Sequence, residues 1–216
     1  MPSVRACPFT VGSEFRSSSS QFYKPHAKEH LMAHRFLISH DSPALYVTIV
    51  TRNRLPVFQT AQMRELLCQA LTEARKSGGF LLFAYVIMFD HIHLLASRKS
   101  TTSDLLRVLK GITARRIIDY LKENEYRSSL AKLQHQERDR KYRYSLWQTE
   151  KNVLPIFSES MFLEKMNYIH SNPVRAGLVQ DAVDYRWSSA RIWQRRPLKN
   201  EPLFTDGDLI HWRRRR

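Results

Sequence analysis

Two histidines stand one residue apart in the otherwise apolar stretch YVIMFDHIHLLAS, residues 85–97. Side chains alternate between the two faces of a strand, so His91 and His93 share one face while Ile92 and Leu94 take the other. Imidazole nitrogen is a common metal ligand, and two rings side by side can begin a metal site. Taken alone, the pair is weak evidence for a metal, because strand histidines that only pack are the more common case.

A helix predicted near residues 158–172, SESMFLEKMNYIHSN, offers further polar groups. Tyr168 and Asn172 are four residues apart and therefore neighbours on one helical face. A hydroxyl and an amide oxygen on that face can both approach a metal held by the histidines, although a packing tyrosine and a C-capping amide remain the alternatives. His170 lies about 200° around the helix from Tyr168, which argues against it as a general base. We expect the helix to end before Pro173.

The segments that must position these residues alternate between strand and helix patterns. The strand segments are rich in β-branched and aromatic residues, and the helical segments carry apolar residues at helical spacing. A tight turn around Phe89 and Asp90 joins the two central strands, and Ser103 caps the second helix. Short antiparallel strands with helices gathered on one main face predict an α+β, ferredoxin-like (RRM-like) sandwich. The predicted order is strand 44–51, helix 60–79, strand 80–88, strand 91–97 and helix 102–124.

Basic residues strongly outnumber acidic ones, with 35 Lys and Arg against 20 Asp and Glu and a formal net charge of +15. Such an excess attracts polyanions, so nucleic acid is the leading partner. A basic protein of the membrane surface is the competing interpretation, but no separate amphipathic basic helix supports it. No apolar run is long enough to cross a bilayer, and we expect a cytoplasmic, nucleoid-associated protein.

The pattern of polarity divides the chain into three parts. Residues 1–40 are polar, contain SSSS, and are expected to form a flexible extension. Residues 41–196 form the main domain, with a mixed-charge insertion near 125–145 that shows no clear core face. Residues 197–216 are expected to form a basic C-terminal tail.

Several motifs carry a resemblance to a known family. DHIHLL resembles the His-hydrophobic-His motif of the HUH single-strand endonucleases. LWQ, YIHSNPVRAGLV and YRWSSAR, in that order, closely resemble the REP-associated tyrosine transposases, which are relatives of the IS200-like single-strand transposases. The similarity runs from about Leu45 to Trp193. Relatives often have Pro-Asn or Pro-Glu before the first histidine, whereas this chain has Phe89 and Asp90, a change in the turn that aims His91.

The resemblance implies a metal-dependent enzyme that nicks and rejoins single-stranded or hairpin DNA. His91, His93 and Asn172 would bind Mg²⁺ or Mn²⁺, and Tyr168 would be the nucleophile. The intermediate would be a 5′-phosphotyrosine with a free 3′-hydroxyl, whose attack on that bond rejoins the strand. The alternative is a catalytically inactive protein that binds hairpin DNA. An RNA-binding ferredoxin-like domain is a more distant reading, because its paired aromatics in a Gly-flanked strand are not evident.

The expected partner is single-stranded or hairpin DNA, of the REP-like palindromic kind by resemblance, with the protein acting as a monomer or a homodimer. Basic residues on the second predicted helix and in the tail are candidates for backbone contacts, which position DNA without reading sequence. Lys165, on the helix of Tyr168, is a further candidate for a phosphate contact. The candidate DNA-binding residues are Arg107, Lys110, Arg115, Arg116, Lys165, Arg213, Arg214, Arg215 and Arg216.

Overall fold

A four-stranded antiparallel sheet lies at the centre of the computed structural model, which describes residues 36–97, 101–135 and 143–211. The strand order is β3-β4-β2-β5. Two-residue strands β1 and β6 form a separate parallel pair. The central strands are β2 (Ala44–Val50), β3 (Leu82–Ile87), β4 (His91–Ala96) and β5 (Asn152–Ile156), and the outer pair is β1 (Phe36–Leu37) and β6 (Ile210–His211).

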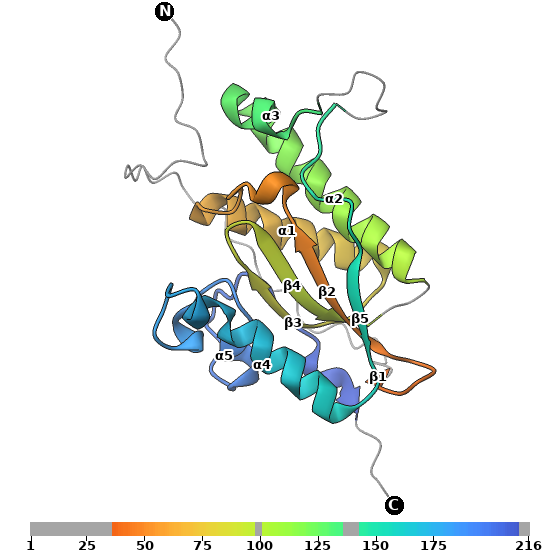
Figure 1. The fold of residues 1–216 in the computed structure, drawn as a ribbon. Helices are drawn as coiled ribbons and strands as arrows, with labels where there is room; N and C mark the ends of the chain where they lie inside the picture. Colours follow the sequence, from red (N-terminus) through yellow and green to blue (C-terminus); the bar gives the residue numbers. More distant parts are fainter. Residues whose placement is uncertain (1–35, 98–100, 136–142, 212–216) are drawn as a thin grey trace, which may run out of the picture.

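Helices cover both faces of this sheet (Figure 1). Helices α1 and α2 pack side by side to form the main helical layer, and α4 packs on the opposite face against β3 and β4. The strand–helix–strand–strand–helix–strand order from β2 to β5 confirms the predicted α+β, ferredoxin-like class. The helices are α1 (Ala61–Gly78), α2 (Thr102–Glu123), α3 (Arg127–Leu133), α4 (Glu159–Arg175) and α5 (Ala190–Trp193), with short 3-10 turns η1 (Arg52–Arg54), η2 (Ala182–Asp184) and η3 (Gly207–Leu209).

The ends of α1 and α2 follow from local capping chemistry. The Thr60 hydroxyl accepts a hydrogen bond from the Met63 amide, and Gly79 ends α1 in the left-handed region at φ 59°. Glycine adopts the left-handed conformation at little cost in energy, which explains why the helix ends at this residue. The cap of α2 is Thr101, whose hydroxyl accepts from the Asp104 amide. Ser103 is therefore not the cap, because the helix begins one residue before it.

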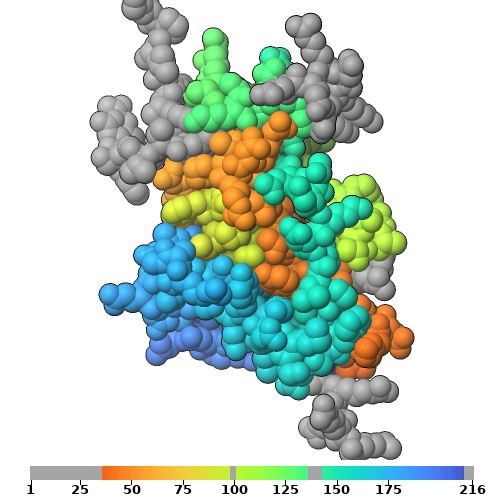
Figure 2. Space-filling view, in the orientation of Figure 1, coloured from red at the N-terminus to blue at the C-terminus, as the bar shows by residue number. Residues whose placement is uncertain are grey.

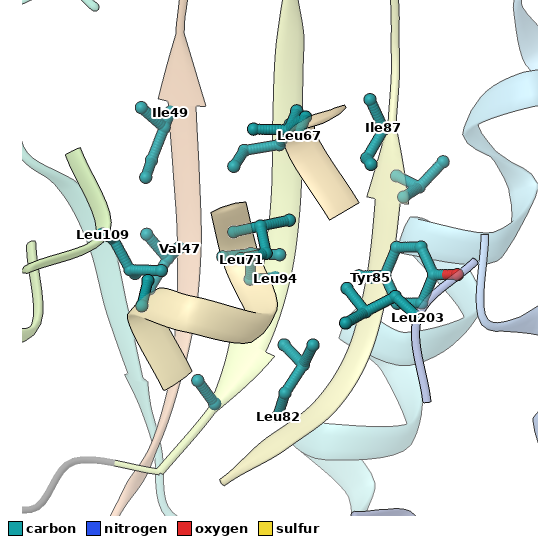
Figure 3. Packing of buried hydrophobic residues seen from close by; sticks show 14 of the residues in the cluster. Val47, Ile49, Leu67, Leu71, Leu82, Tyr85, Ile87, Leu94, Leu109 and Leu203 are labelled. Carbon is teal, nitrogen blue, oxygen red and sulfur yellow. The ribbon is translucent and has the colours of Figure 1, made fainter. Parts of the chain in front are cut away.

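A large part of the core lies between the sheet and the α1–α2 layer (Figure 3). Val47 and Ile49 of β2 project toward Leu67 and Leu71 of α1, and Leu109 of α2 closes the same space. All five side chains are buried. Because β2 alternates its side chains, this packing turns Tyr46 and Thr48 toward the opposite face, where α4 lies. In the part of the chain that the structure describes, no helix is both long and apolar enough to span a membrane.

Helix α4 continues through Pro173 to Arg175, so the predicted end before the proline is wrong. Proline lacks the amide hydrogen that would bond to a carbonyl four residues back, but near a helix end this removes a single bond. The last turn is closed instead by the Ala176 amide, which donates to the Asn172 carbonyl, and by the left-handed Gly177 at φ 68°. The added residues place Arg175 on the same helix as Tyr168 and Asn172.

Two segments that the sequence left without a core face contribute to the packing. In the insertion, α3 buries Leu130 and Leu133 next to α2. Beyond residue 196, Leu203 reaches the core and lies beside Tyr85 (Figure 3). Residues 197–211 therefore pack on the domain rather than forming a tail, while the candidate tail arginines Arg213–Arg216 and most of the 1–40 extension lie outside the described residues.

Candidate metal and tyrosine site

The two histidines of β4 share one face of the sheet, as their spacing predicts. In the antiparallel register His91 lies opposite Val50, and His93 lies opposite Thr48. The centroids of the two imidazole rings are 4.8 Å apart, with one ring edge-on to the other. Helix α4 covers part of this face. The strand register therefore places both imidazoles on the same side of the sheet as Tyr168.

His93 is held by hydroxyl groups from the neighbouring strand. Its Nδ1 hydrogen-bonds the Tyr46 hydroxyl at 2.9 Å and the Thr48 hydroxyl at 2.8 Å. Burial, assisted by the nearby His91, lowers the pKa of His93 to about 3, and only Asp90 opposes the shift. A neutral imidazole is the form that binds metals, and with Nδ1 engaged, Nε2 is the nitrogen available for it.

His91 is held by a carboxylate instead. Its Nδ1 lies 2.6 Å from Asp90 Oδ1, and the other oxygen, Oδ2, accepts from Arg54 Nη1 at 3.0 Å. An ionised carboxylate only accepts hydrogen bonds, so Nδ1 is the donor in this contact and Nε2 is the nitrogen left for a cation. The residue that departs from the family pattern thus orients the histidine that follows it.

Tyr168 of α4 lies directly against these rings. Its ring centroid is 5.5 Å from that of His93 and 6.1 Å from that of Tyr46. The Arg175 guanidinium also contacts this ring, with its central carbon 5.3 Å from the ring centroid of Tyr168. Tyr168 is 37% exposed, and Figure 2 shows strand atoms reaching the surface between α4 and the segment around β5. The tyrosine is therefore open to a large ligand.

Asn172 lies one turn after Tyr168 and is oriented by it. Its Nδ2 donates to the Tyr168 carbonyl oxygen at 2.7 Å, and because a carbonyl only accepts, Oδ1 is the oxygen left for a cation. The described residues contain no group of three or more His, Cys, Asp and Glu side chains placed for a metal. A cation here would be held by two imidazole nitrogens and at most an amide oxygen from the chain, a donor set that suits a divalent ion with open positions.

His170 points to the other side of α4, as its position around the helix predicts. Its Nε2 hydrogen-bonds the buried Ser189 hydroxyl at 2.9 Å, and the ring is 9% exposed. Burial lowers the pKa of His170 to about 4. The ring therefore anchors the helix to the rest of the domain and is not aimed at the tyrosine hydroxyl.

The candidate DNA-binding residues of α2 lie in the helical layer behind the sheet, away from Tyr168, and their charges are engaged within the protein. Arg107 pairs with Asp104 at 3.3 Å, Arg115 with Asp119 at 3.7 Å, and Arg116 with Glu73 at 2.6 Å. Lys110 donates to the carbonyl oxygens of Gln148 and Glu150. Lys165 is on the helix of Tyr168 but pairs with Glu164 at 2.7 Å.

The sequence interpretation missed four residues around the site. Tyr46 and Thr48 are the polar members of one face of an apolar strand, a signal that alternation alone could have given. Arg175 is seven residues after Tyr168, which places it two turns further on the same helical face. Arg54 could not have been found, because its contact with Asp90 depends on the unusual backbone of η1.

Comparisons with known proteins identify the family and the fold. A family model described as "Transposase IS200 like" matches residues 42–172, more than half of the chain. The solved structure of a REP-associated tyrosine transposase bound to a REP hairpin covers 89% of this chain and 93% of its own, at 18% identity and a TM-score of 0.54, which shows a shared fold. A transposase structure from Deinococcus radiodurans covers 60% of this chain and 90% of its own, at 21% identity and a TM-score of 0.43. Among curated proteins, none matches the sequence.

Proposed function

Because this chain belongs to the family of IS200-like transposases, we propose that it nicks and rejoins single-stranded or hairpin DNA through a covalent bond to Tyr168. The observation that supports this most directly is the packing of an exposed tyrosine ring against His93, which itself contacts His91. A candidate nucleophile and two imidazoles that could bind a metal thus lie together beside α4, where Tyr168 is exposed and His93 is buried.

In the cleavage step, the Tyr168 hydroxyl oxygen attacks a backbone phosphorus. A bond forms between that oxygen and phosphorus, the bond to the 3′ oxygen breaks, and the departing oxygen takes up a proton as a 3′-hydroxyl. A free tyrosine has a pKa of about 10 and needs assistance to attack near neutral pH. The Arg175 guanidinium, 5.3 Å from the ring, favours the negative charge that develops on the phenol and on the phosphate.

The intermediate stores the energy of the original ester as a 5′-phosphotyrosine. The 3′-hydroxyl of another strand can attack this phosphorus and release the tyrosine, so that the number of phosphodiester bonds is conserved. Rejoining therefore needs no high-energy cofactor. The same residues serve both directions, which is the chemistry that a transposase requires for strand transfer.

His91, His93 and Asn172 would hold a divalent cation, through the two Nε2 atoms and the amide Oδ1. When bound, the cation polarises the scissile phosphate and offsets charge on its oxygens. Mg²⁺ prefers oxygen ligands and keeps several waters, whereas imidazole suits the transition metals better. We therefore expect Mn²⁺ to bind more tightly than Mg²⁺ at this site.

The hairpin stem would contact the end of the molecule near His91 rather than the outer face of α2. There the Arg52 Nη1 hydrogen-bonds His135 Nδ1 at 2.7 Å, and the His135 amide donates to the Arg143 carbonyl. Arg127 and Arg143 are both exposed, and the His135 contacts connect Arg143 with Arg52 of η1. Cations already paired with carboxylates, such as Arg115, release fewer counterions on binding DNA than unpaired ones.

The first experiment tests for the covalent intermediate. Purified protein is mixed with labelled hairpin DNA and Mn²⁺ or Mg²⁺, denatured, and examined for a protein–DNA adduct. We expect an adduct that is absent from Tyr168→Phe and His91→Ala but present in Tyr120→Phe, a tyrosine of α2 in the helical layer behind the sheet. Tight binding by the wild type without an adduct, across hairpins and both metals, would leave a hairpin-binding protein in place of the enzyme.

Binding measurements on the same DNA test the proposed stem contact. Replacing Arg143 by Gln should reduce the slope of log affinity against log salt by about 0.9, the value for one phosphate contact on duplex DNA. The matched change Arg115→Gln should leave the slope nearly unchanged. Equal effects of the two changes would contradict the assignment of this surface.

A further inference from the structure

We propose that Asp90 and Arg54 are positioning residues that fix His91 in the one tautomer and orientation able to bind the metal, an inference that rests on the proposed function of the site. Asp90 lies between the two side chains and uses a different carboxylate oxygen for each, Oδ1 for His91 and Oδ2 for Arg54. Each carboxylate oxygen thus has its own partner, and this restricts the rotation of the carboxylate and of the imidazole that it contacts.

The two histidines differ in how strongly their partners dictate a tautomer. Hydroxyls donate or accept, so Tyr46 and Thr48 leave the proton free to sit on either nitrogen of His93. The carboxylate of Asp90 accepts only, which places the proton of His91 on Nδ1 and makes Nε2 a stronger ligand. His91 is thus the preset ligand of the pair, whereas His93 takes up its ligand form when the cation arrives.

The backbone that presents Arg54 is strained. Asn53 and Arg54 both have left-handed backbones, at φ 52° and φ 51°, although neither is glycine. Consecutive left-handed residues with side chains are unfavourable and persist where surrounding contacts enforce them. Here Thr51 provides those contacts. Its hydroxyl shares one hydrogen between the Leu55 and Asp90 carbonyl oxygens, and its amide donates to the Asp90 carbonyl.

The strained turn therefore ties the end of β2 to the turn between β3 and β4, at the residue before His91. A contribution to stability does not account for the arrangement. The Arg54 side chain is 67% exposed, and an ion pair so open to solvent adds little to folding. Strain next to the site, combined with a weak stabilising pair, is what a positioning role would produce.

The experiment measures Mn²⁺ binding by calorimetry on the full-length protein without DNA. Asp90→Ala should weaken the affinity about ten- to a hundredfold, the usual effect of removing the partner of a ligating histidine. Asp90→Asn keeps an acceptor and should lose less, and Arg54→Gln should lose the least. Arg195→Gln, which breaks an exposed pair with Asp208 elsewhere, is the matched control and should bind as the wild type does.

Nitrogen NMR of the imidazoles gives a second readout that a merely structural role would not change. The metal-free wild type should show His91 protonated on Nδ1, and Asp90→Ala should show a mixture of tautomers. Unchanged Mn²⁺ affinity and an unchanged tautomer in folded Asp90→Ala would overturn the inference while leaving the proposed function intact. A wild type that binds no Mn²⁺ would refute the metal site itself, and the inference with it.

Discussion

Helix α4 has two sides that do different work. On the site side, Tyr168 is 37% exposed and the amide oxygen of Asn172 is left for a ligand. On the anchored side, Phe162, Ile169 and His170 are all buried, and His170 bonds to Ser189. Groups that act on DNA must be exposed, whereas the helix that carries them must be held in place. Helix α4 meets both requirements because one of its sides is exposed and the other is buried.

The anchored side continues into residues 185–206, which we call the C-terminal clasp. Its members bond along β3: the Tyr185 hydroxyl donates to the Ile87 carbonyl at 2.7 Å, and the Trp193 ring nitrogen donates to the Phe83 carbonyl at 2.8 Å. Asp206 accepts from the Leu82 amide. The clasp thus satisfies polar groups of an edge strand, whereas the candidate site leaves Tyr168 exposed. Changes in the clasp should alter stability, and changes in the site should alter chemistry.

The largest stability effect that tests this contrast is expected from Glu201→Gln in the clasp. Glu201 and Arg191 form two hydrogen bonds, at 2.8 Å and 3.0 Å, with side chains only 0% and 9% exposed. Removing one charge leaves the other buried without its counterion, which should lower the free energy of unfolding by about 3 kcal/mol. Urea denaturation measures the loss, and adduct formation per folded molecule should stay unchanged.

The exposed pair of Arg195 and Asp208 provides the control for that change, since both side chains are 79% exposed. Asp208→Asn should alter the free energy of unfolding by less than about 1 kcal/mol. If Glu201→Gln instead abolished the adduct in protein that remains folded, the separation between clasp and site would be wrong.

A smaller effect is expected from pH, through His170. Its pKa is lowered to about 4 in the folded protein from the ordinary 6.5, so the unfolded chain binds a proton first as the pH falls. The stability that His170 contributes is complete above pH 6.5 and is lost progressively between 6.5 and 4. From pH 7 to pH 5 the loss should be about 2 kcal/mol.

Urea unfolding of metal-free protein at several pH values tests this, with His170→Gln beside the wild type. The variant should show a flatter profile, and the difference between the two curves isolates His170 from other titrating groups such as His93. Parallel curves would show that the ring is not held neutral by the anchored side of α4.

The central fold could be predicted because its signals are local. The β-branched and aromatic residues of 44–51 and the apolar run around 91–97 predict the strands, and the face shared by His91 and His93 follows from the alternation of side chains in a strand. The end of α4 was missed because the prediction assumed that a helix stops before a proline. A proline in the last turn destabilises a helix less than that assumption requires. The clasp was missed because its packing joins residues distant in sequence, such as Asp206 and Leu82, whose composition resembles a polar tail.

The same division between local and distant contacts holds for the site. Tyr168 and Asn172 were placed by helical spacing, and the resemblance assigned their roles. The predicted cations of α2 could not be excluded from sequence, because an arginine paired across helices, such as Arg116 with Glu73, looks the same as a free one. Whether a basic residue is available to DNA depends on its partner, which composition does not reveal.

The smallest expected change in free energy comes from Asn172→Ala, which is also the sharpest test of the site side of α4. If Oδ1 is a metal ligand, the change should weaken Mn²⁺ binding at least about tenfold, which equals about 1.4 kcal/mol. The free energy of unfolding should move by less than about 0.5 kcal/mol, as for other surface substitutions. Asn167→Ala, at an exposed position of the same helix, is the matched control and should change neither quantity. If Asn172→Ala lowered stability and left Mn²⁺ affinity intact, the amide would belong with the anchoring groups, and the cation would be held by the two histidines and the DNA phosphate alone.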